Sequence, residues 1–273
     1  MDAYVLKTEM RNPATTHIDL MSTTEMATCI QRENENAVFA IEKALPSIVE
    51  ACDRISEKLT NGGRLIYIGA GSSGRLGVLD AVECPPTYGI PKDMVVGIIA
   101  GGPKCMFQAA EREEDNMSEA AQDLQNKKLS SLDAVVGISA SGNAAYVVGA
   151  MKYAKEMGCI TIGITSNEGS RLTKCSDISI VADTGPEVIT GSTRMKAGTA
   201  HKMILNMLST IVMIKLGYVY ENLMVNLKPT NEKLRHRMIF IVRQILSCNE
   251  KEAVNVLDAH NWSIRAVVES QIM

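Results

Sequence analysis

Aromatic side chains and excess charge are both scarce in this 273-residue sequence: aromatics make up 4% of it, and 28 basic residues face 31 acidic ones. Nucleic-acid binding usually leaves a clustered basic footprint, so this near balance argues against a nucleic-acid partner. The sequence also lacks an uncharged apolar run of the ~18 residues that a membrane-spanning helix needs. We therefore expect neither nucleic acid nor a membrane among the partners.

Paired cysteines and metal-ligand spacings are missing as well. The seven cysteines are scattered without a Cys-x-x-Cys pair, and none of the four histidines pairs with a cysteine at a zinc-ligand spacing. In a chain of this size the pattern indicates reduced thiols, not a disulfide framework or a metal site. The first residues also lack the basic stretch and apolar core of a secretory signal. These features predict a soluble cytoplasmic protein without a metal.

What the sequence does contain is ordinary hydrophobicity, 46%, arranged in three parts. Residues 1–60 are expected to form a helical arm, because apolar positions recur at helical spacing from about 21 to 59; Pro46 should bend or split this helix. Residues 61–220 alternate strand and helix patterns. Residues 221–273 are predicted to be helical again, over 232–247 and in two short helices within 249–270.

The middle part predicts an α/β fold. Five short apolar runs rich in β-branched residues occur at 65–70, 94–100, 134–140, 159–166 and 177–182. Helical patterns separate or follow them, at 104–125, 143–158 and 195–217 among other places. Continuous apolar strands that alternate with helices are typical of a parallel sheet covered on both faces. Such sheets bind ligands beyond the carboxyl ends of their strands, where the strand order reverses.

The first of these strands leads into a glycine-rich loop that contains Gly71, Ser72 and Ser73. It resembles a dinucleotide fingerprint, but the next strand ends in Gly101-Gly102 and not in the acidic residue that a ribose needs. A glycine turn that opens a helix suits a single anion, because free backbone N–H groups point at it. A tight turn with serine caps explains this loop equally well.

A second serine-glycine loop follows the third strand and contains Ser139, Ser141, Gly142 and Asn143. Two such loops at strand ends of one parallel sheet would converge over its edge, which favours a phosphate site. Neither loop has the lysine of a P-loop, so hydrolysis of a nucleoside triphosphate is not expected. The two loops together predict a small phosphorylated metabolite as ligand.

Carboxylates stand near both loops. Glu83 is expected at the C-terminal end of the helix that the first loop opens, where the helix dipole disfavours its charged form. The segment Cys84-Pro85-Pro86 should stop that helix. The run 111–115 is crowded with acidic residues in the middle of the predicted helix 104–125, so most of it should be a solvated face. His201 could contact a ligand, but a core or interface role is favoured.

Several segments closely resemble a known family. GRLIYIGAGSSGRLGVLDAVECPPTYG, GPEVITGSTRMKAGTAHK and NLMVNLKPTNEKL resemble the N-acetylmuramic acid 6-phosphate etherases, over about residues 11–265. The segment 185–202 resembles the signature that this family shares with the glucokinase regulatory protein. Both belong to the sugar isomerase (SIS) superfamily. The resemblance implies a three-layer SIS fold with a five-stranded parallel sheet, flanked by the helical arm and the small C-terminal helical segment.

The resemblance implies release of D-lactate from N-acetylmuramic acid 6-phosphate in cell-wall sugar recycling. It also implies a homodimer with composite active sites, and neither a metal nor an organic cofactor. The family's two catalytic glutamates fall on Glu83, as proton donor, and on Glu114, as base. An elimination needs two such carboxyls with separated pKa values. Sugar-phosphate contacts are expected from residues of the two loops and of the shared signature: Gly71, Ser72, Ser73, Ser139, Ser141, Gly142, Asn143, Ser192, Thr193 and Lys202.

This chain departs from the family pattern at several places. Val82 replaces the usual serine beside Glu83, and Ser72 stands where the family has threonine. Asn143, Ala144 and Ala145 stand where the family has arginine, threonine and proline. We hypothesise that Ser139, where the family has alanine, supplies the hydroxyl lost at Ala144. Two other functions remain open: a non-catalytic sugar-phosphate sensor like the glucokinase regulatory protein, and a sugar-phosphate isomerase, whose branch the Glu-Cys-Pro-Pro segment does not resemble.

Overall fold

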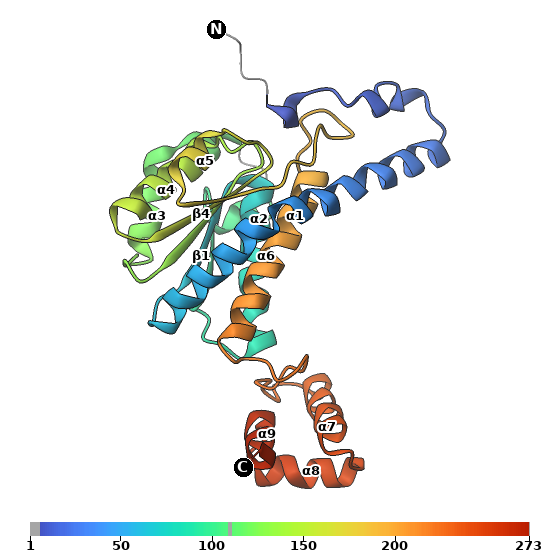
Figure 1. Ribbon diagram of the computed structural model, residues 1–273, viewed down its shortest axis with the longest axis vertical. Coiled ribbons are helices and arrows are strands. Elements are labelled where there is room, and N and C mark those ends of the chain that lie inside the picture. The colour runs from blue at the N-terminus through green and yellow to red at the C-terminus, as the bar shows by residue number, and fades with distance from the viewer. Residues whose placement is uncertain (1–5, 109–110, 273) are drawn as a thin grey trace.

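The structure, a computed structural model, describes residues 6–108 and 111–272 and has a parallel sheet between two layers of helices (Figure 1). The five strands are β1 (Leu65–Gly69), β2 (Val95–Ile99), β3 (Ala134–Ile138), β4 (Ile160–Thr165) and β5 (Ile178–Val181). Their spatial order is β2-β1-β3-β4-β5, and all neighbours are parallel. The predicted α/β fold is confirmed. The chain runs from β1 outward to β2 and then back past β1 to β3, so the strand order reverses between β1 and β3.

Alternation along the strands divides the core into two layers. Leu65 and Tyr67 of β1 point toward one face, and Ile66 and Ile68 point toward the other. The first face is covered by α1 (Thr23–Thr60), α2 (Gly71–Tyr88) and α6 (Lys196–Lys215), and the second by α3 (Met117–Asn126), α4 (Ala145–Glu156) and α5 (Arg171–Cys175). Every residue of β1, β3 and β4 is buried, as expected for central strands of a two-sided parallel sheet.

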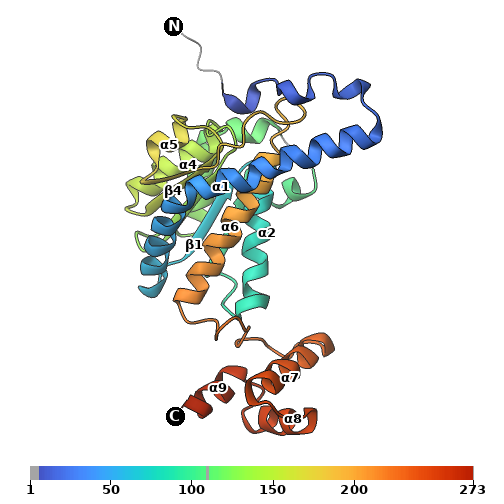
Figure 2. The same cartoon turned by 45° about the vertical axis from the view of Figure 1, so that its right-hand side comes forward.

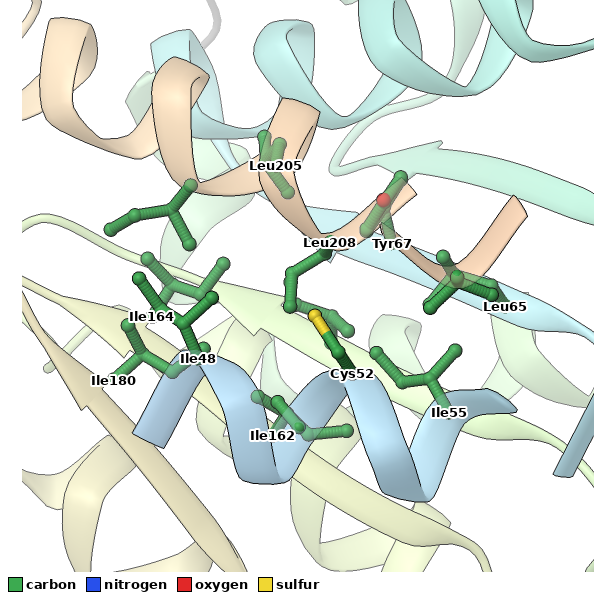
Figure 3. Close-up of a cluster of buried hydrophobic side chains, with 14 of the residues drawn as sticks. Ile48, Cys52, Ile55, Leu65, Tyr67, Ile162, Ile164, Ile180, Leu205 and Leu208 are labelled. Atoms are coloured by element: carbon green, nitrogen blue, oxygen red, sulfur yellow. The ribbon is translucent and has the colours of Figure 1, made fainter. Parts of the chain in front are cut away.

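The core of the first face lies between α1, α6 and the sheet (Figure 3). Helix α1 directs Ile48, Cys52 and Ile55 into this core at helical spacing. The opposing side chains come from three strands and from α6: Leu65, Tyr67, Ile162, Ile164, Ile180, Leu205 and Leu208. Burial of each such aliphatic side chain contributes roughly 1.5–3 kcal/mol. This packing fixes α6, and with it the segment before α6, against the sheet.

The prolines inside α1 and α2 end neither helix. Helix α1 is continuous through Pro46 and changes direction along its length (Figure 2), so the predicted bend occurs without a split. The expectation that Cys84-Pro85-Pro86 stops α2 is wrong, because α2 continues to Tyr88. It ends at Gly89, which has a φ of 67° and whose N–H donates to the Pro85 carbonyl. A glycine in the left-handed conformation is a common end of a helix.

The prediction of one continuous helix over 104–125 is also wrong. The structure has a 3₁₀ helix at Pro103–Met106, a second one at Glu111–Asp115, and only then α3. Asn116 caps α3, since its side chain accepts a hydrogen bond from the Glu119 N–H. Acidic side chains at neighbouring positions of the 111–115 run repel one another, which disfavours one continuous helix through it. Residues 109 and 110 of the predicted helix lie outside the described residues.

Short helices flank the sheet domain at both ends. Before α1 come the 3₁₀ helices Lys7–Glu9, Pro13–Thr15 and Ile18–Leu20, which lie beside the segment that precedes α6 (Figures 1 and 2). After α6 come α7 (Glu232–Leu246), α8 (Glu250–Ala259) and α9 (Ile264–Ile272), which share a separate hydrophobic cluster. Within the described residues, no helix is both long and apolar enough to span a bilayer.

Candidate active site

A cavity of about 290 Å³ lies where the strand order reverses, over the carboxyl ends of β1 and β3. Four segments far apart in the sequence line it: the loops after β1 and β3, the 3₁₀ helix 111–115, and the segment that leads into α6, with Glu9 of the N-terminal segment added. Its lining residues are Glu9, Ala70, Gly71, Ser72, Ser73, Glu114, Ile138, Ser139, Ala140, Ser141, Ala144, Gly191, Thr193 and Gly198. The two serine-glycine loops therefore converge as the sequence predicted.

The loop after β1 presents a helix N-terminus to the cavity. Helix α2 begins at Gly71, whose φ of 52° lies in the left-handed region that favours glycine. Ser72 and Ser73 follow in the first turn, where backbone N–H groups have no partner within the helix. This turn therefore offers N–H donors and two hydroxyls to an anion.

The loop after β3 is held by its own serines. The Ser139 hydroxyl accepts from the Gly142 N–H at 3.1 Å, and the Ser141 hydroxyl accepts from the Asn143 N–H at 3.1 Å. Gly142 has a φ of 68°, and a Cβ there would lie 2.2 Å from the Ser170 hydroxyl oxygen, so only glycine fits. Ser139 and Ser141 line the cavity, whereas Gly142 acts through its backbone and is not in the lining.

The Asn143 side chain contacts α5. Its side-chain oxygen accepts a hydrogen bond of 3.0 Å from the Arg171 N–H at the start of α5, and it is not in the cavity lining. Asn143 therefore lies outside the set of cavity-lining serines, and its amide oxygen holds the start of α5.

Glu114 lines the cavity, but its neighbour Glu113 does not. Gly101 lies against the Glu113 side chain, since a Cβ built on it would be 2.8 Å from the Glu113 Cγ. Partial burial and the Glu113 carboxylate together raise the pKa of Glu119 in α3. The 3₁₀ helix thus directs Glu113 toward Gly101 and Glu119 while it brings Glu114 to the cavity.

A buried charge network holds the segment before α6 in place. Glu187 is fully buried, and its two carboxylate oxygens accept from the N–H groups of Lys196 and Ala197, each at 3.0 Å. The Lys196 side chain, 1% exposed, forms an ion pair with Glu33 of α1. A carboxylate at a helix N-terminus complements the helix dipole. These contacts position Gly191, Thr193 and Gly198 in the cavity wall.

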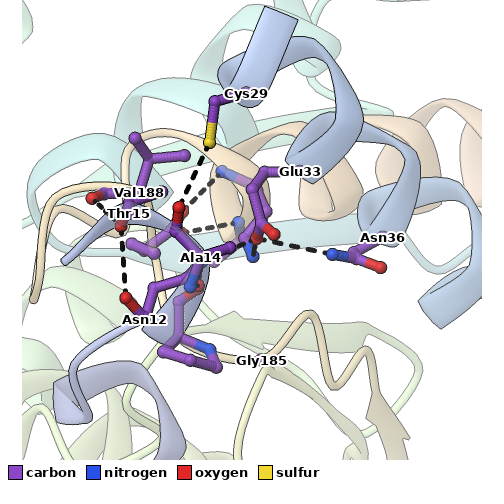
Figure 4. A network of polar contacts seen from close by, with 12 residues as sticks. Asn12, Ala14, Thr15, Cys29, Glu33, Asn36, Gly185 and Val188 are labelled. Atoms are coloured by element: carbon purple, nitrogen blue, oxygen red, sulfur yellow. Dashed lines mark hydrogen bonds and ion pairs between the residues drawn. The ribbon is translucent and has the colours of Figure 1, made fainter. Parts of the chain in front are cut away.

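Glu33 connects this network to the N-terminal segment (Figure 4). Its carboxylate also accepts from the Asn12 amide at 2.7 Å, and Asn12 donates to the Pro186 carbonyl at 3.1 Å. Although partial burial disfavours the carboxylate, the hydrogen bonds from Lys196 and Asn12 hold the pKa of Glu33 below its usual value. Sequence reasoning missed Glu33, Glu187 and Lys196. Glu187 and Lys196 stand in the segment 185–202 that resembles the family signature, whereas Glu33 lies in the polar run 31–36, which carries no signal of a buried role.

A groove of about 420 Å³ adjoins the cavity between α2 and α6. Ser72 and Gly198 line both spaces, so the groove continues the cavity along the two helices. Three cationic side chains line it: Arg75, Arg194 and Lys202. Lys202 therefore belongs to the groove, where its ammonium also donates to Asn206. Thr193 lies in the cavity lining, and Ser192 lies outside the lining of both spaces.

Glu83 lies away from the cavity. It is exposed near the C-terminal end of α2, about three turns or roughly 18 Å along the helix axis from Gly71. Leu79 and Val82, 45% and 57% exposed, lie beside it on the same helix. Within one chain the structure therefore brings Glu114, but not Glu83, to the serine loops.

His201 is a core residue. It is fully buried in α6, its Nε2 lies 3.2 Å from the Ser166 hydroxyl oxygen, and burial lowers its pKa to about 4. The interpretation of a core role is confirmed. Among residues 6–108 and 111–272, no cluster of three or more histidine, cysteine or acidic side chains could hold a metal ion.

Comparison with known proteins agrees with this geometry. The SIS domain family matches residues 115–211, and the N-terminal SIS domain family of the glucokinase regulatory protein matches residues 47–155. The solved structure of a phosphoheptose isomerase from Francisella tularensis superposes with a TM-score of 0.52 over 71% of this chain and 98% of its own, at 18% identity. The fold and its cavity at the strand reversal define a SIS-domain protein.

Relatives of much higher sequence identity show the family to which the chain belongs within this class. The chain is 49% identical to the N-acetylmuramic acid 6-phosphate etherase of Pasteurella multocida over 97% of this chain and 88% of that protein. It is 51% identical to the etherase of Caldanaerobacter subterraneus over 96% of this chain and 86% of that protein. The chain belongs to the N-acetylmuramic acid 6-phosphate etherase family.

Proposed function

We propose that this protein is a cytoplasmic lyase that cleaves the D-lactyl ether of N-acetylmuramic acid 6-phosphate, giving N-acetylglucosamine 6-phosphate and D-lactate. One observation carries the proposal beyond family membership: Glu114 lines the same cavity as the serine loops after β1 and β3. A phosphate anchor and a carboxylate in one cavity are what proton abstraction from a sugar phosphate requires.

The serine loops bind the phosphate in this proposal. The N-terminus of α2 directs N–H groups and the positive end of the helix dipole toward the anion. The hydroxyls of Ser72, Ser73, Ser139 and Ser141 add hydrogen bonds, and hydrogen bonds to a charged group are stronger than neutral ones. With the phosphate fixed at this end, the sugar carbons extend across the cavity toward Glu114.

The chemistry is an elimination followed by a hydration. In the open-chain sugar, the aldehyde at C1 acidifies the proton on C2, and the Glu114 carboxylate removes it. The electron pair forms a C2–C3 double bond as the C3–O bond breaks, and protonated Glu83 gives its proton to the departing lactate oxygen. Water then adds at C3 and a proton returns to C2, which restores the sugar. Each acid–base contribution is worth about 10²–10⁴-fold.

The position of Glu83 is consistent with a composite site in a homodimer. Because Glu83 lies about three turns from the start of α2, it cannot reach the cavity of its own chain without rearrangement of the helix. The exposed Leu79 and Val82 beside it are apolar side chains of the kind that interfaces bury. We infer that a second copy covers this face of α2 and receives Glu83 at its own cavity, the same exchange occurring in reverse in a twofold dimer.

The decisive test is release of D-lactate from N-acetylmuramic acid 6-phosphate by the purified protein, with the Glu114→Gln variant as control. We expect lactate from the wild type and a loss of at least about a hundredfold in the variant. A protein that binds the sugar phosphate in calorimetry but releases no lactate would be the sensor. Interconversion of aldose and ketose phosphates without lactate release would identify the isomerase.

A further inference from the structure

A second carboxylate lines the cavity and has no role in the mechanism above. Glu9 comes from the 3₁₀ helix Lys7–Glu9, far in sequence from every other lining residue. A Cβ built on Gly191 would lie 3.3 Å from the Glu9 Oε2, so this carboxylate rests against the glycine of the segment before α6. A larger side chain at position 191 would crowd it.

The segment around Glu9 is fastened to the sheet domain on both sides. Lys7 forms an ion pair with Asp183, and Thr8, 1% exposed, accepts a hydrogen bond of 3.1 Å from the Asn167 amide. Further along, the Thr15 hydroxyl donates to the Val188 carbonyl at 2.8 Å. These contacts hold an otherwise exposed carboxylate at the cavity wall.

Asn167 links this segment directly to the phosphate loop. It is 1% exposed, and its amide donates both to the Thr8 hydroxyl and to the carbonyl of Ala140, which lies in the cavity lining. The backbone next to Glu9 and the loop after β3 are therefore joined by one buried side chain. The position of Glu9 is fixed relative to the loop that contains Ser139 and Ser141.

The surroundings of Glu9 indicate what it binds. Within the described residues, the cavity lining contains no lysine, arginine or histidine, so Glu9 faces the ligand space without a cation beside it in that wall. An ionised carboxylate accepts hydrogen bonds and donates none, so its partner must be a donor. A phosphate would be repelled, whereas the hydroxyls of a sugar chain are suitable donors.

We propose that Glu9 is a substrate-binding residue that accepts a hydrogen bond from a hydroxyl of the sugar and so distinguishes a sugar phosphate from phosphate alone. This inference rests on the proposed function, since it takes the cavity to be the sugar-phosphate site. The expected change in affinity differs between the two ligands. Loss of the Glu9 charge should weaken binding of the sugar phosphate and leave inorganic phosphate bound equally or more tightly, because a repelling charge is gone.

The test is calorimetric titration of the wild type and of Glu9→Gln with N-acetylglucosamine 6-phosphate and with inorganic phosphate. We expect Glu9→Gln to raise the Kd of the sugar phosphate about tenfold, the loss typical of one charged hydrogen bond, and not to raise that of phosphate. Asp19→Asn, an exposed acidic residue of the same N-terminal segment outside the lining, is the matched control and should bind both ligands like the wild type.

Two results would overturn the proposal. If Glu9→Gln binds the sugar phosphate within about twofold of the wild type, Glu9 does not contact it. If the variant loses affinity for both ligands equally, Glu9 only positions the loops. Both results are independent of turnover: failure of the wild type to release lactate would refute the etherase reaction while the ratio of the two affinities still tests Glu9.

Discussion

The hydroxyl oxygens of Ser139 and Ser141 lie 3.4 Å apart at the end of β3, and each accepts a hydrogen bond from a backbone N–H of its own loop. A hydroxyl that accepts from the backbone still has a proton to donate. Both side chains line the cavity, so the loop is shaped by the same oxygens that face the ligand. This arrangement supports the hypothesis that Ser139 supplies a phosphate contact where Ala144 has none.

Ser139→Ala should weaken binding of a phosphorylated sugar by roughly ten- to a hundredfold, because a hydrogen bond to a charged group contributes about 1.5–3 kcal/mol. Calorimetric titration with N-acetylglucosamine 6-phosphate measures the loss, and unphosphorylated N-acetylglucosamine is the control ligand, for which little change is expected. Ala144 lines the same cavity, so Ala144→Thr should recover part of the affinity in the double variant. Wild-type affinity in Ser139→Ala would show that the hydroxyl has not been relocated.

Most of the fold could be predicted because its signals are local. The five strands lie at the five β-branched runs, and α4, α6, α7, α8 and α9 lie at the expected helical patterns. The errors occurred where local rules compete. Proline in the last turn of α2 was tolerated before the Gly89 cap, and the acidic run 111–115 formed a separate 3₁₀ helix instead of part of a long helix.

The site could be predicted only in part. The two serine loops converge because parallel strands end at the same edge of a sheet, which the sequence pattern implies. The contacts between Glu33 and Lys196, and between Thr8 and Asn167, join residues about 160 apart in the chain, and no periodicity encodes such pairs. Asn143 accepts a hydrogen bond from the N–H of Arg171, which begins α5, and the sequence pattern had not indicated this short helix.

Glu83→Gln and Glu114→Gln should each be inactive alone and should complement each other when mixed. Glu83→Gln is expected to retain less than about a tenth of wild-type turnover, as for an acid catalyst. If each cavity takes Glu114 from one chain and Glu83 from its partner, a mixed dimer has one intact site. Random reassortment of the two variants should then restore about a quarter of the wild-type lactate release. No recovery after verified subunit exchange would place both glutamates in one chain or assign the donor to another residue.

Glu114→Gln should block exchange of the C2 proton with deuterated solvent, the step that precedes departure of lactate. Glu113→Gln is the matched control, because Glu113 is directed toward Gly101 and Glu119 and lies outside the cavity lining. Proton magnetic resonance of the C2 signal in deuterium oxide follows the exchange. Equal losses in the two variants would contradict the assignment of the base to Glu114.

His201 should make the protein less stable as the pH falls from 6.5 toward 4. Burial lowers the pKa of His201 to about 4, whereas a histidine in the unfolded chain titrates near its ordinary value of 6.5. Between these values the unfolded state binds a proton that the folded state does not. The contribution of neutral His201 is therefore fully present above pH 6.5 and is lost as the pH falls to about 4, with a total change of about 3 kcal/mol.

The measurement is the free energy of unfolding from urea titrations at several pH values between 4 and 7, compared with His201→Gln. Glutamine can keep a hydrogen bond to Ser166 but cannot titrate, so the difference in stability between wild type and variant should shrink steadily toward pH 4. Carboxylates also titrate in this range, but they do so in both proteins and cancel in the difference. His236→Gln is the control for loss of a histidine at the surface, because the His236 side chain is 66% exposed. A difference between wild type and His201→Gln that stays constant across the range would show that His201 takes up its proton equally well in the folded and unfolded states.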